Sequence, residues 1–426
     1  MKATFAGAAA LALTATTAMA GGIERGVNNY GLLFEPGDKI EFGATFVRPN
    51  VVGKYEAALG GGDTGNMANS YTVLSATYKN QLSEKLDFGI FLNQPYGAGA
   101  EYTRGVYSGL TAQWESDEIA AILKYNLTDR ISVFGGARYV KSESNIKIPE
   151  LLIRSSVGNH AQRLGAEAQD LGAQAAAAAQ NGDLAAAAEL GARAQALGAE
   201  AQRLGAAVNP ASNPFGDPGL NFSAESGSQG DWGYVVGAAY SIPDIALRVA
   251  LTYQSAITHN FDADENLGTL GINDTGELEI EMPQSLALDF QTGVAPGTLV
   301  FGSVKWTEWS AWEVRTPAYE SVTGNRITGI DDDVVTWKLG VGRQFNEKLS
   351  GFAQVTYEAP NGREASRLNP VDGNLAFGLG GQWTDGNSKL RAGVQYVSLG
   401  EAEDSTGTKF EGNSAIGVGV NFTMNF

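Results

Sequence analysis

The sequence predicts an all-β fold, a 14-stranded antiparallel transmembrane β-barrel. Three observations predict it. Segments of about 9–15 residues, the length that a tilted strand needs to cross a bilayer, alternate apolar and polar side chains. Short and long connections follow one another in strict order, and an even strand number lets the sheet close without a free edge. The last residues, 413–426, form the clearest strand, with an apolar side chain at every second position from Ile416 to Phe426.

Composition and charge narrow the class of protein. The chain has 426 residues, no cysteine and a net charge of −18. Without cysteine there are neither disulfides nor thiolate metal sites, and phosphates would be repelled, so no nucleic-acid partner is expected. No metal or cofactor is expected either. After the first residues, no apolar run approaches the roughly 18 residues of a membrane helix.

The N-terminus carries an export signal. Lys2 precedes an Ala- and Leu-rich stretch that ends in Ala18-Met19-Ala20, so residues 1–20 are predicted to be a cleaved signal peptide. Residues 21–38 lack clear periodicity. The domain 39–426 is then the predicted barrel.

The fourteen predicted strands follow in order. They occupy 39–48, 69–79, 85–93, 115–126, 130–143, 231–241, 245–258, 281–292, 297–310, 334–344, 347–358, 374–384, 388–399 and 413–426. The even connections are short. The odd ones are long, at 49–68, 94–114, 144–230, 259–280, 311–333, 359–373 and 400–412. Periplasmic turns of such barrels are short, so both termini are expected in the periplasm.

Residues 159–207 predict a helical hairpin inside the third long loop. This stretch is rich in Ala and Gln, and Leu-Gly pairs recur at a spacing of seven on both sides of Asn181-Gly182-Asp183. The hairpin should project outside the cell. It is either a solvated decoration or a lid over the barrel mouth.

Two segments carry a resemblance to a known family. Pro283-x-Ser285 starts a strand, and Trp306-Thr307-x-Trp309-Ser310 ends the next one, within 281–313. The second segment is Asn93-Gln94-Pro95-Tyr96-Gly97-Ala98. Both resemble the FadL/TodX family of outer-membrane transporters for long-chain fatty acids and hydrocarbons.

The resemblance implies a barrel plugged by an N-terminal hatch, here 21–38, and a sideways exit through a kinked third strand. Gly89, Asn93, Pro95 and Gly97 are the candidates for this kink, because Pro donates no ladder hydrogen bond and Gly packs nothing. Alternatively, these residues mark only the start of an ordinary loop after the strand. The family's Asn-Pro-Ala hatch motif is absent, which puts a copied hatch mechanism in doubt.

Catalytic chemistry is not indicated. The two histidines, His160 and His259, fall in predicted outer loops without Ser, Asp or Cys at a catalytic spacing. A membrane-embedded lipase would need a His-centred triad in the wall, and His259 alone lies near a strand end. We therefore expect no enzyme.

Alternation also predicts which side chains face the lumen. The lumenal cations are candidates for a carboxylate site: Arg138, Arg248, Lys338, Lys305, Lys124 and Arg391. Pairing with lumenal acids such as Asp289 is their structural alternative. Phe91, Leu299 and Phe301 are candidates for an acyl-chain path, and Trp309 and Trp312 for ligand contacts at the outer mouth.

The preferred function is passive passage of long-chain fatty acids or similar hydrophobic molecules through the bacterial outer membrane. A general hydrophilic porin and a surface adhesin acting through the helical loop are the alternatives. The expected partners are the ligand, outer-membrane lipid and lipopolysaccharide, and the barrel-insertion machinery, which by resemblance binds Phe426. A monomer is expected. Acidic loops such as Asp331–Asp333 leave divalent-cation binding open.

Overall fold

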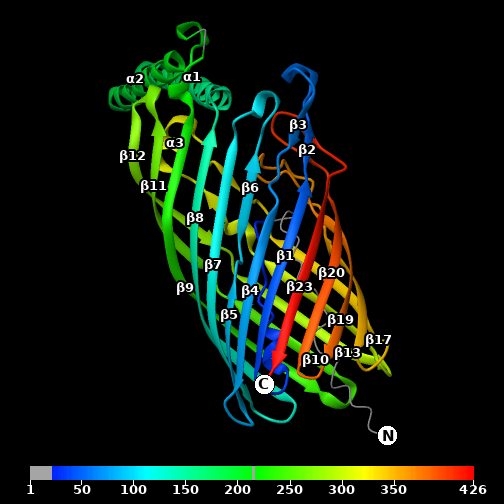
Figure 1. The fold of residues 1–426 in the computed structure, drawn as a ribbon. Helices are drawn as coiled ribbons and strands as arrows, with labels where there is room; N and C mark the ends of the chain where they lie inside the picture. Colours follow the sequence, from blue (N-terminus) through cyan, green and yellow to red (C-terminus); the bar gives the residue numbers. More distant parts are fainter. Residues whose placement is uncertain (1–21, 214–215) are drawn as a thin grey trace.

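The computed structural model describes residues 22–213 and 216–426, so the predicted signal peptide lies outside it. Its main feature is one antiparallel sheet of seventeen strand segments that closes on itself (Figure 1). Three wall positions each hold two successive segments, namely β5 with β6, β10 with β11, and β12 with β13. The barrel therefore has fourteen wall positions, as the sequence predicts.

The wall strands have the following bounds: β1 (Lys39–Asn50), β4 (Tyr71–Gln81), β5 (Leu86–Asn93), β6 (Gly97–Glu101), β7 (Thr111–Asn126), β8 (Ile131–Ile148), β9 (Phe222–Ile242), β10 (Leu247–Gln254), β11 (Ile257–Leu267), β12 (Ile272–Met282), β13 (Ser285–Ala295), β14 (Thr298–Thr307), β17 (Val334–Gln344), β18 (Leu349–Glu358), β19 (Asn374–Asp385), β20 (Ser388–Leu399) and β23 (Ser414–Asn425). The long loops add β2 (Val52–Lys54), β3 (Asp63–Asn66), β15 (Glu313–Val314), β16 (Thr328–Gly329), β21 (Ala402–Glu403), β22 (Lys409–Phe410) and the helices α1 (Glu150–Gln180), α2 (Leu184–Ala207) and α3 (Pro317–Thr323).

The seam of the barrel joins its first and last strands. β1 pairs with β4 on one side and with β23 on the other, from Lys39–Asn425 to Asn50–Ser414. On β23 the apolar side chains Ile416, Val418 and Val420 point outward and are 43–51 % exposed, while the residues between them face inward. An outer face of this kind suits contact with lipid.

Several predicted boundaries are wrong, and the main differences lie in the long loops. Residues 97–101, 144–148, 222–230 and most of 259–280, expected as loops, are strand. On β11 the apolar side chains Phe261 and Ala263 point inward and Asp262 and Asp264 point outward. This is the reverse of the pattern lower in the wall, because here the outer face meets water. The wall is therefore taller between β8 and β12 than elsewhere (Figure 1).

The predicted helical hairpin is present between β8 and β9, and α1 begins at Glu150, nine residues before the expected start. Alanine is the best helix former, and Asp183 caps α2 by accepting a hydrogen bond from the Ala186 amide across 3.0 Å. Within the described residues, no helix combines the length and the apolar character needed to span a membrane.

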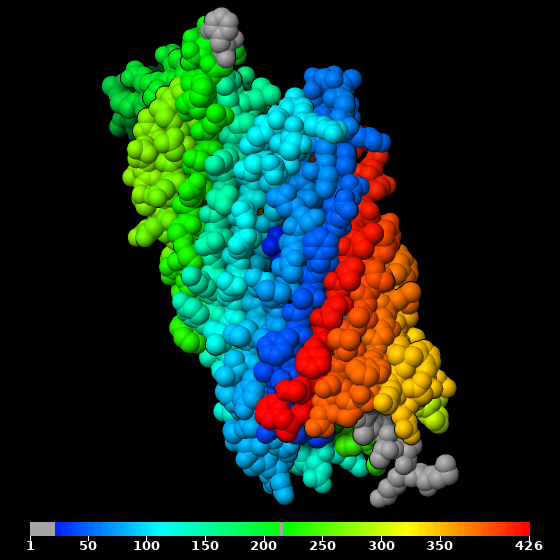
Figure 2. All heavy atoms as spheres, in the orientation of Figure 1, coloured from blue at the N-terminus to red at the C-terminus, as the bar shows by residue number. Residues whose placement is uncertain are grey.

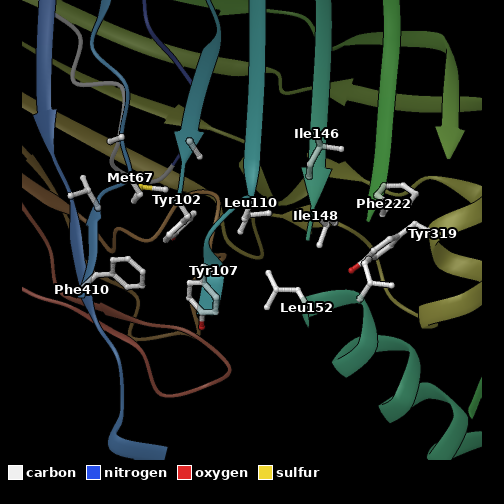
Figure 3. Close-up of a cluster of buried hydrophobic side chains, with 14 of the residues drawn as sticks. Met67, Tyr102, Tyr107, Leu110, Ile146, Ile148, Leu152, Phe222, Tyr319 and Phe410 are labelled. Atoms are coloured by element: carbon white, nitrogen blue, oxygen red, sulfur yellow. The ribbon is translucent and has the colours of Figure 1, made fainter. Parts of the chain in front are cut away.

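A hydrophobic cluster covers the long-loop end (Figure 3). Leu152 of α1 packs beside Ile146 and Ile148 of β8, and Phe222 of β9 lies 5.1 Å from Tyr319 of α3, centroid to centroid. Nearby, Tyr107 donates a hydrogen bond to Asp404 across 2.6 Å. Burial raises the pKa of Tyr107, which keeps the hydroxyl protonated for this bond. The loops thus form a packed cap.

Candidate functional site

The N-terminal segment, residues 22–38, lies inside the barrel. Leu33 is fully buried and belongs to a cluster with Phe91 of β5 and Ile122 of β7. The ring of Tyr30 meets Phe91 edge to face, with centroids 5.0 Å apart. Phe91, predicted to line an acyl-chain path, instead packs beneath this segment.

Lumenal cations hold the segment in place. The Glu35 carboxylate accepts a hydrogen bond from Lys389 across 3.0 Å and lies 3.3 Å from the Lys39 ammonium. Lys124 donates to the carbonyl of Leu33 across 2.8 Å. Because these contacts come from different parts of the wall, the segment is tied to several strands at once.

Nearer the N-terminal end of the segment, Glu24 forms an ion pair with Lys305 of β14. Asn28 donates to Glu118 of β7 across 2.7 Å, and Glu118 accepts from Arg138 of β8 across 2.9 Å. The segment is therefore fixed at both of its ends and in its middle.

A cavity of about 240 Å³ lies between the segment and the wall. Its apolar lining includes Phe34 and Phe134, together with the predicted path residues Leu299 and Phe301. Its polar lining comes from β10, β13, β14, β17 and β18: Arg248, Thr252, Gln254, Asp289, Gln291, Lys305, Thr336, Lys338, Gln354, Thr356 and Glu358. A cavity that combines an apolar surface with convergent polar groups is typical of small-molecule sites.

Two of the cavity's cations, Arg248 and Lys338, differ from the others in their contacts. Arg248 donates to Gln291 across 3.1 Å, and its guanidinium stands 4.8 Å from the centre of the Phe34 ring. Lys338 lies near enough to Asp289 and Lys305 for their charges to act on its ammonium group. Neither Arg248 nor Lys338 forms a close ion pair with a carboxylate of the described residues.

The wall is interrupted beside β4. Pairing of β4 with β5 ends at Ala76–Leu92, and β6 pairs with β7 but not with β4. The chain between β5 and β6 turns inward, where the amide of Gly97 donates to the carbonyl of Ile23 across 2.7 Å. Dark-blue atoms of the N-terminal segment are visible there through the surface (Figure 2). The N-terminal segment thus backs the opening.

One constellation was missed by sequence analysis. His259, expected in an outer loop, is buried on β11, with Nδ1 2.8 Å from the Asp231 carboxylate and Nε2 3.2 Å from the Ser142 hydroxyl. The contacts have the order of a catalytic triad. Ser142 is only 1 % exposed. We regard the chain of contacts as a link between β8, β9 and β11.

The comparisons with known proteins agree with this architecture. The family model for outer membrane protein transport proteins (OMPP1/FadL/TodX) matches residues 2–426. The chain belongs to the FadL/TodX family. No curated protein matches the sequence.

Solved structures of FadL/TodX proteins share the fold at low identity. A Pseudomonas aeruginosa FadL homologue is 12 % identical with a TM-score of 0.65, and the alignment includes 94 % of this chain and 93 % of the homologue. The Pseudomonas putida toluene transporter TodX is 15 % identical with a TM-score of 0.59, covering 94 % of this chain and 92 % of that one. The CymD monoaromatic hydrocarbon channel is 14 % identical with a TM-score of 0.53, covering 92 % and 88 %.

The six predicted lumenal cations separate into two groups in this FadL/TodX barrel. Lys124 pairs with Asp87 at 2.7 Å, Arg138 with Glu118, Lys305 with Glu24, and Arg391 donates to Gln382 across 3.1 Å. Arg248 and Lys338 face the cavity, which Lys305 also lines. Their role in carboxylate binding stays a prediction.

The predicted kink residues and mouth residues are also placed. Asn93, Pro95 and Gly97 lie at the break in the wall, whereas Gly89 sits in regular pairing between β4 and β7. Trp309 and Trp312 are 3 % and 6 % exposed and pack on each other, so they are buried beneath the mouth. Trp309 lines the cavity and contacts Gly22.

Proposed function

We propose that this FadL/TodX protein is a passive outer-membrane channel for long-chain fatty acids or other hydrophobic small molecules. In the proposal the long loops face outward, both termini are periplasmic, and Phe426 serves the insertion machinery. Ligand enters at the long-loop end, occupies the cavity, and leaves through the wall opening or toward the periplasm.

One observation carries the proposal. The cavity combines an apolar wall at Leu299, Phe301 and Phe134 with two cations, Arg248 and Lys338, that lack a close carboxylate partner among the described residues. An amphipathic anion matches both features, because its carboxylate pairs with the cations while its body covers the apolar wall. A general porin would instead need an open lumen, and residues 22–38 fill this one.

The cavity volume bears on ligand size. About 240 Å³ is slightly below the roughly 300 Å³ at which pockets for drug-sized ligands begin. With the N-terminal segment in place, the cavity therefore holds a compact molecule or one end of a longer chain. The similar structures of TodX, a toluene transporter, and CymD, a monoaromatic hydrocarbon channel, support the inclusion of compact hydrocarbons.

Uptake by whole cells tests the proposal. Bacteria that lack their own fatty-acid channel would express the protein and be given radiolabelled laurate or toluene. The proposal expects uptake of at least one probe above that of cells with an empty vector. A large, steady conductance in planar bilayers together with background uptake of both probes would contradict it and favour a porin.

A further inference from the structure

The side chain of Gln94 spans the break in the wall. The backbone amide of Leu74 on β4 donates to Gln94 Oε1 across 3.0 Å. Gln94 Nε2 in turn donates to the Asp117 carboxylate on β7 across 3.3 Å. One side-chain amide therefore stands where a continuous strand would otherwise join β4 to β7.

Arg25 of the N-terminal segment fills the opening from inside. Its guanidinium lies 4.2 Å from the centre of the Tyr71 ring on β4, a cation–π contact. Its backbone amide donates to the carbonyl of Pro95 across 2.8 Å. A Cβ on Gly97 would lie 2.5 Å from Arg25 Nε, so glycine at this position leaves room for the arginine.

Arg25 has unused hydrogen-bonding capacity. Its Nε is buried without a hydrogen-bond partner among the described residues. Arg25 lines a second cavity of about 350 Å³, whose other lining residues are mostly polar and include Ser116, Lys141, Ser142 and the acids Glu115, Asp117 and Glu143. A buried donor without a partner is costly, and a polar ligand group that reaches it would remove this cost.

The opening begins at the upper limit of the apolar outer face. One row of outward residues crosses β5, β7, β8 and β9: Leu92, Ile119, Tyr139 and Trp232. Of these, Leu92, Ile119 and Trp232 are 45–71 % exposed. The outward residues two positions further up β7 and β8 are Asp117 and Lys141. Aromatic rings mark the interface in such barrels, so the opening lies at the level of the lipid headgroups.

We infer that Gln94 and Arg25 form a gate in this opening, which selects amphipathic molecules with a polar or anionic end. The inference rests on the proposed release through the wall. A passing molecule displaces the two hydrogen bonds of the Gln94 side chain and the cation–π contact of Arg25, while the pairing of β4 with β5 and of β6 with β7 stays intact. Its polar end meets Arg25 and then the headgroup layer, while its apolar body enters the hydrocarbon below.

Substitution of Gln94 tests whether its two hydrogen bonds hold the gate closed. Gln94→Leu keeps the size of the side chain and removes both hydrogen bonds, so uptake of laurate should rise roughly two- to tenfold, the effect of losing a typical hydrogen bond. Gln113→Leu is the matched control, because Gln113 donates a hydrogen bond across 2.6 Å to Glu115 on the same strand, β7, and so does not span the break. Equal laurate uptake by the wild type and Gln94→Leu would show that the Gln94 hydrogen bonds do not hold the gate closed.

Substitution of Arg25 tests selectivity. Arg25→Met retains most of the volume but loses the charge, so the ratio of laurate uptake to toluene uptake should fall. An unchanged ratio would show that Arg25 only occupies space, and the selectivity part of the inference would be wrong.

A disulfide across the opening tests the gate as a whole. The chain has no cysteine, and a Cβ on Gly99 would lie 3.2 Å from the Cβ of Asn69, a few tenths of an ångström short of disulfide geometry. Asn69→Cys/Gly99→Cys should therefore staple the chain just before β4 to β6, at the upper edge of the opening, where the amide of Asn69 already donates to the carbonyl of Gly99 across 3.1 Å. The control, Ala168→Cys/Gly198→Cys, staples α1 to α2, where the Cβ atoms would be 3.9 Å apart.

The oxidised staple should reduce laurate uptake, and a reductant should restore it, while the control staple has no effect. If the wild type takes up neither probe, the proposed channel function fails. If it takes up laurate and the stapled variant does so equally well, transport stands and the gate is wrong.

Discussion

The guanidinium of Arg138 donates to the Glu118 carboxylate across 2.9 Å, and each of the two side chains is 2 % exposed. Arg138→Ala would leave Glu118 buried without its cation, so the free energy of unfolding should fall by about 3–5 kcal/mol. Urea denaturation in detergent micelles measures this loss. The double variant Arg138→Met/Glu118→Leu should recover most of it, because no charge is then buried alone. A single variant as stable as the wild type would mean that water reaches the pair.

Lys338 provides the sharpest test of carboxylate binding. Lys338→Gln should weaken laurate binding roughly 10- to 100-fold, the range for loss of a hydrogen bond to a charged group, and leave toluene binding unchanged. Calorimetry on the purified protein measures both affinities. Lys348→Gln is the control, because Lys348 pairs with Asp385 at the exposed end of the wall and does not line the cavity. Equal losses for both ligands would indicate a change in cavity shape rather than loss of a charge contact.

The ion pair between Glu24 and Lys305 anchors the start of the N-terminal segment to β14. Lys305→Glu should loosen the segment through repulsion and raise the frequency of open conductance events in planar bilayers. The exchanged variant Glu24→Lys/Lys305→Glu should return to wild-type conductance because the attraction is restored. Conductance that stays high in the exchanged variant would assign the effect to the cavity wall rather than to the pair.

Ser142 should not act as a nucleophile. Its contact with His259 has triad order, but its side chain is 1 % exposed and faces a channel lumen. A fluorophosphonate probe should leave the folded protein unlabelled, as measured by mass spectrometry. Labelling that disappears in Ser142→Ala would reopen the enzyme hypothesis.

The helical hairpin should be dispensable for uptake. A Cβ on Gly165 would lie 4.0 Å from the Cβ of Ala201, so a short Gly-Gly linker can replace residues 166–200 without moving the stems. The shortened protein should keep wild-type laurate uptake. Lost uptake with an intact, heat-resistant barrel would favour a lid over the mouth, and lost surface adhesion alone would favour an adhesin.

The wall was predictable where the outer face meets lipid. On β23 alternation identified each outward residue, because only apolar side chains suit that face. It failed on residues 222–230 and on β11, which rise above the apolar outer face. There Phe261 points inward and Asp262 outward, so the rule that apolar residues face out gives the wrong side.

The site was harder to predict, because its contacts join distant residues. Alternation placed Arg248 and Lys338 toward the lumen, but it carried no information about Glu24, Arg25 or Glu35, which reach those walls from the aperiodic N-terminal segment. Ser142, Asp231 and His259 likewise meet only through the order of strands β8, β9 and β11. The inward turn at Pro95 gave a usable hint, since Pro cannot donate to a ladder.

The seam between β1 and β23 also constrains how the barrel can assemble. Lys39 and Asn425, which pair there, are 386 residues apart, and residues 22–38 run directly into β1. The closed sheet therefore surrounds a segment that is covalently joined to one strand of its own seam. A barrel closed without this segment would admit a peptide added later only through its two ends or through the opening beside β4.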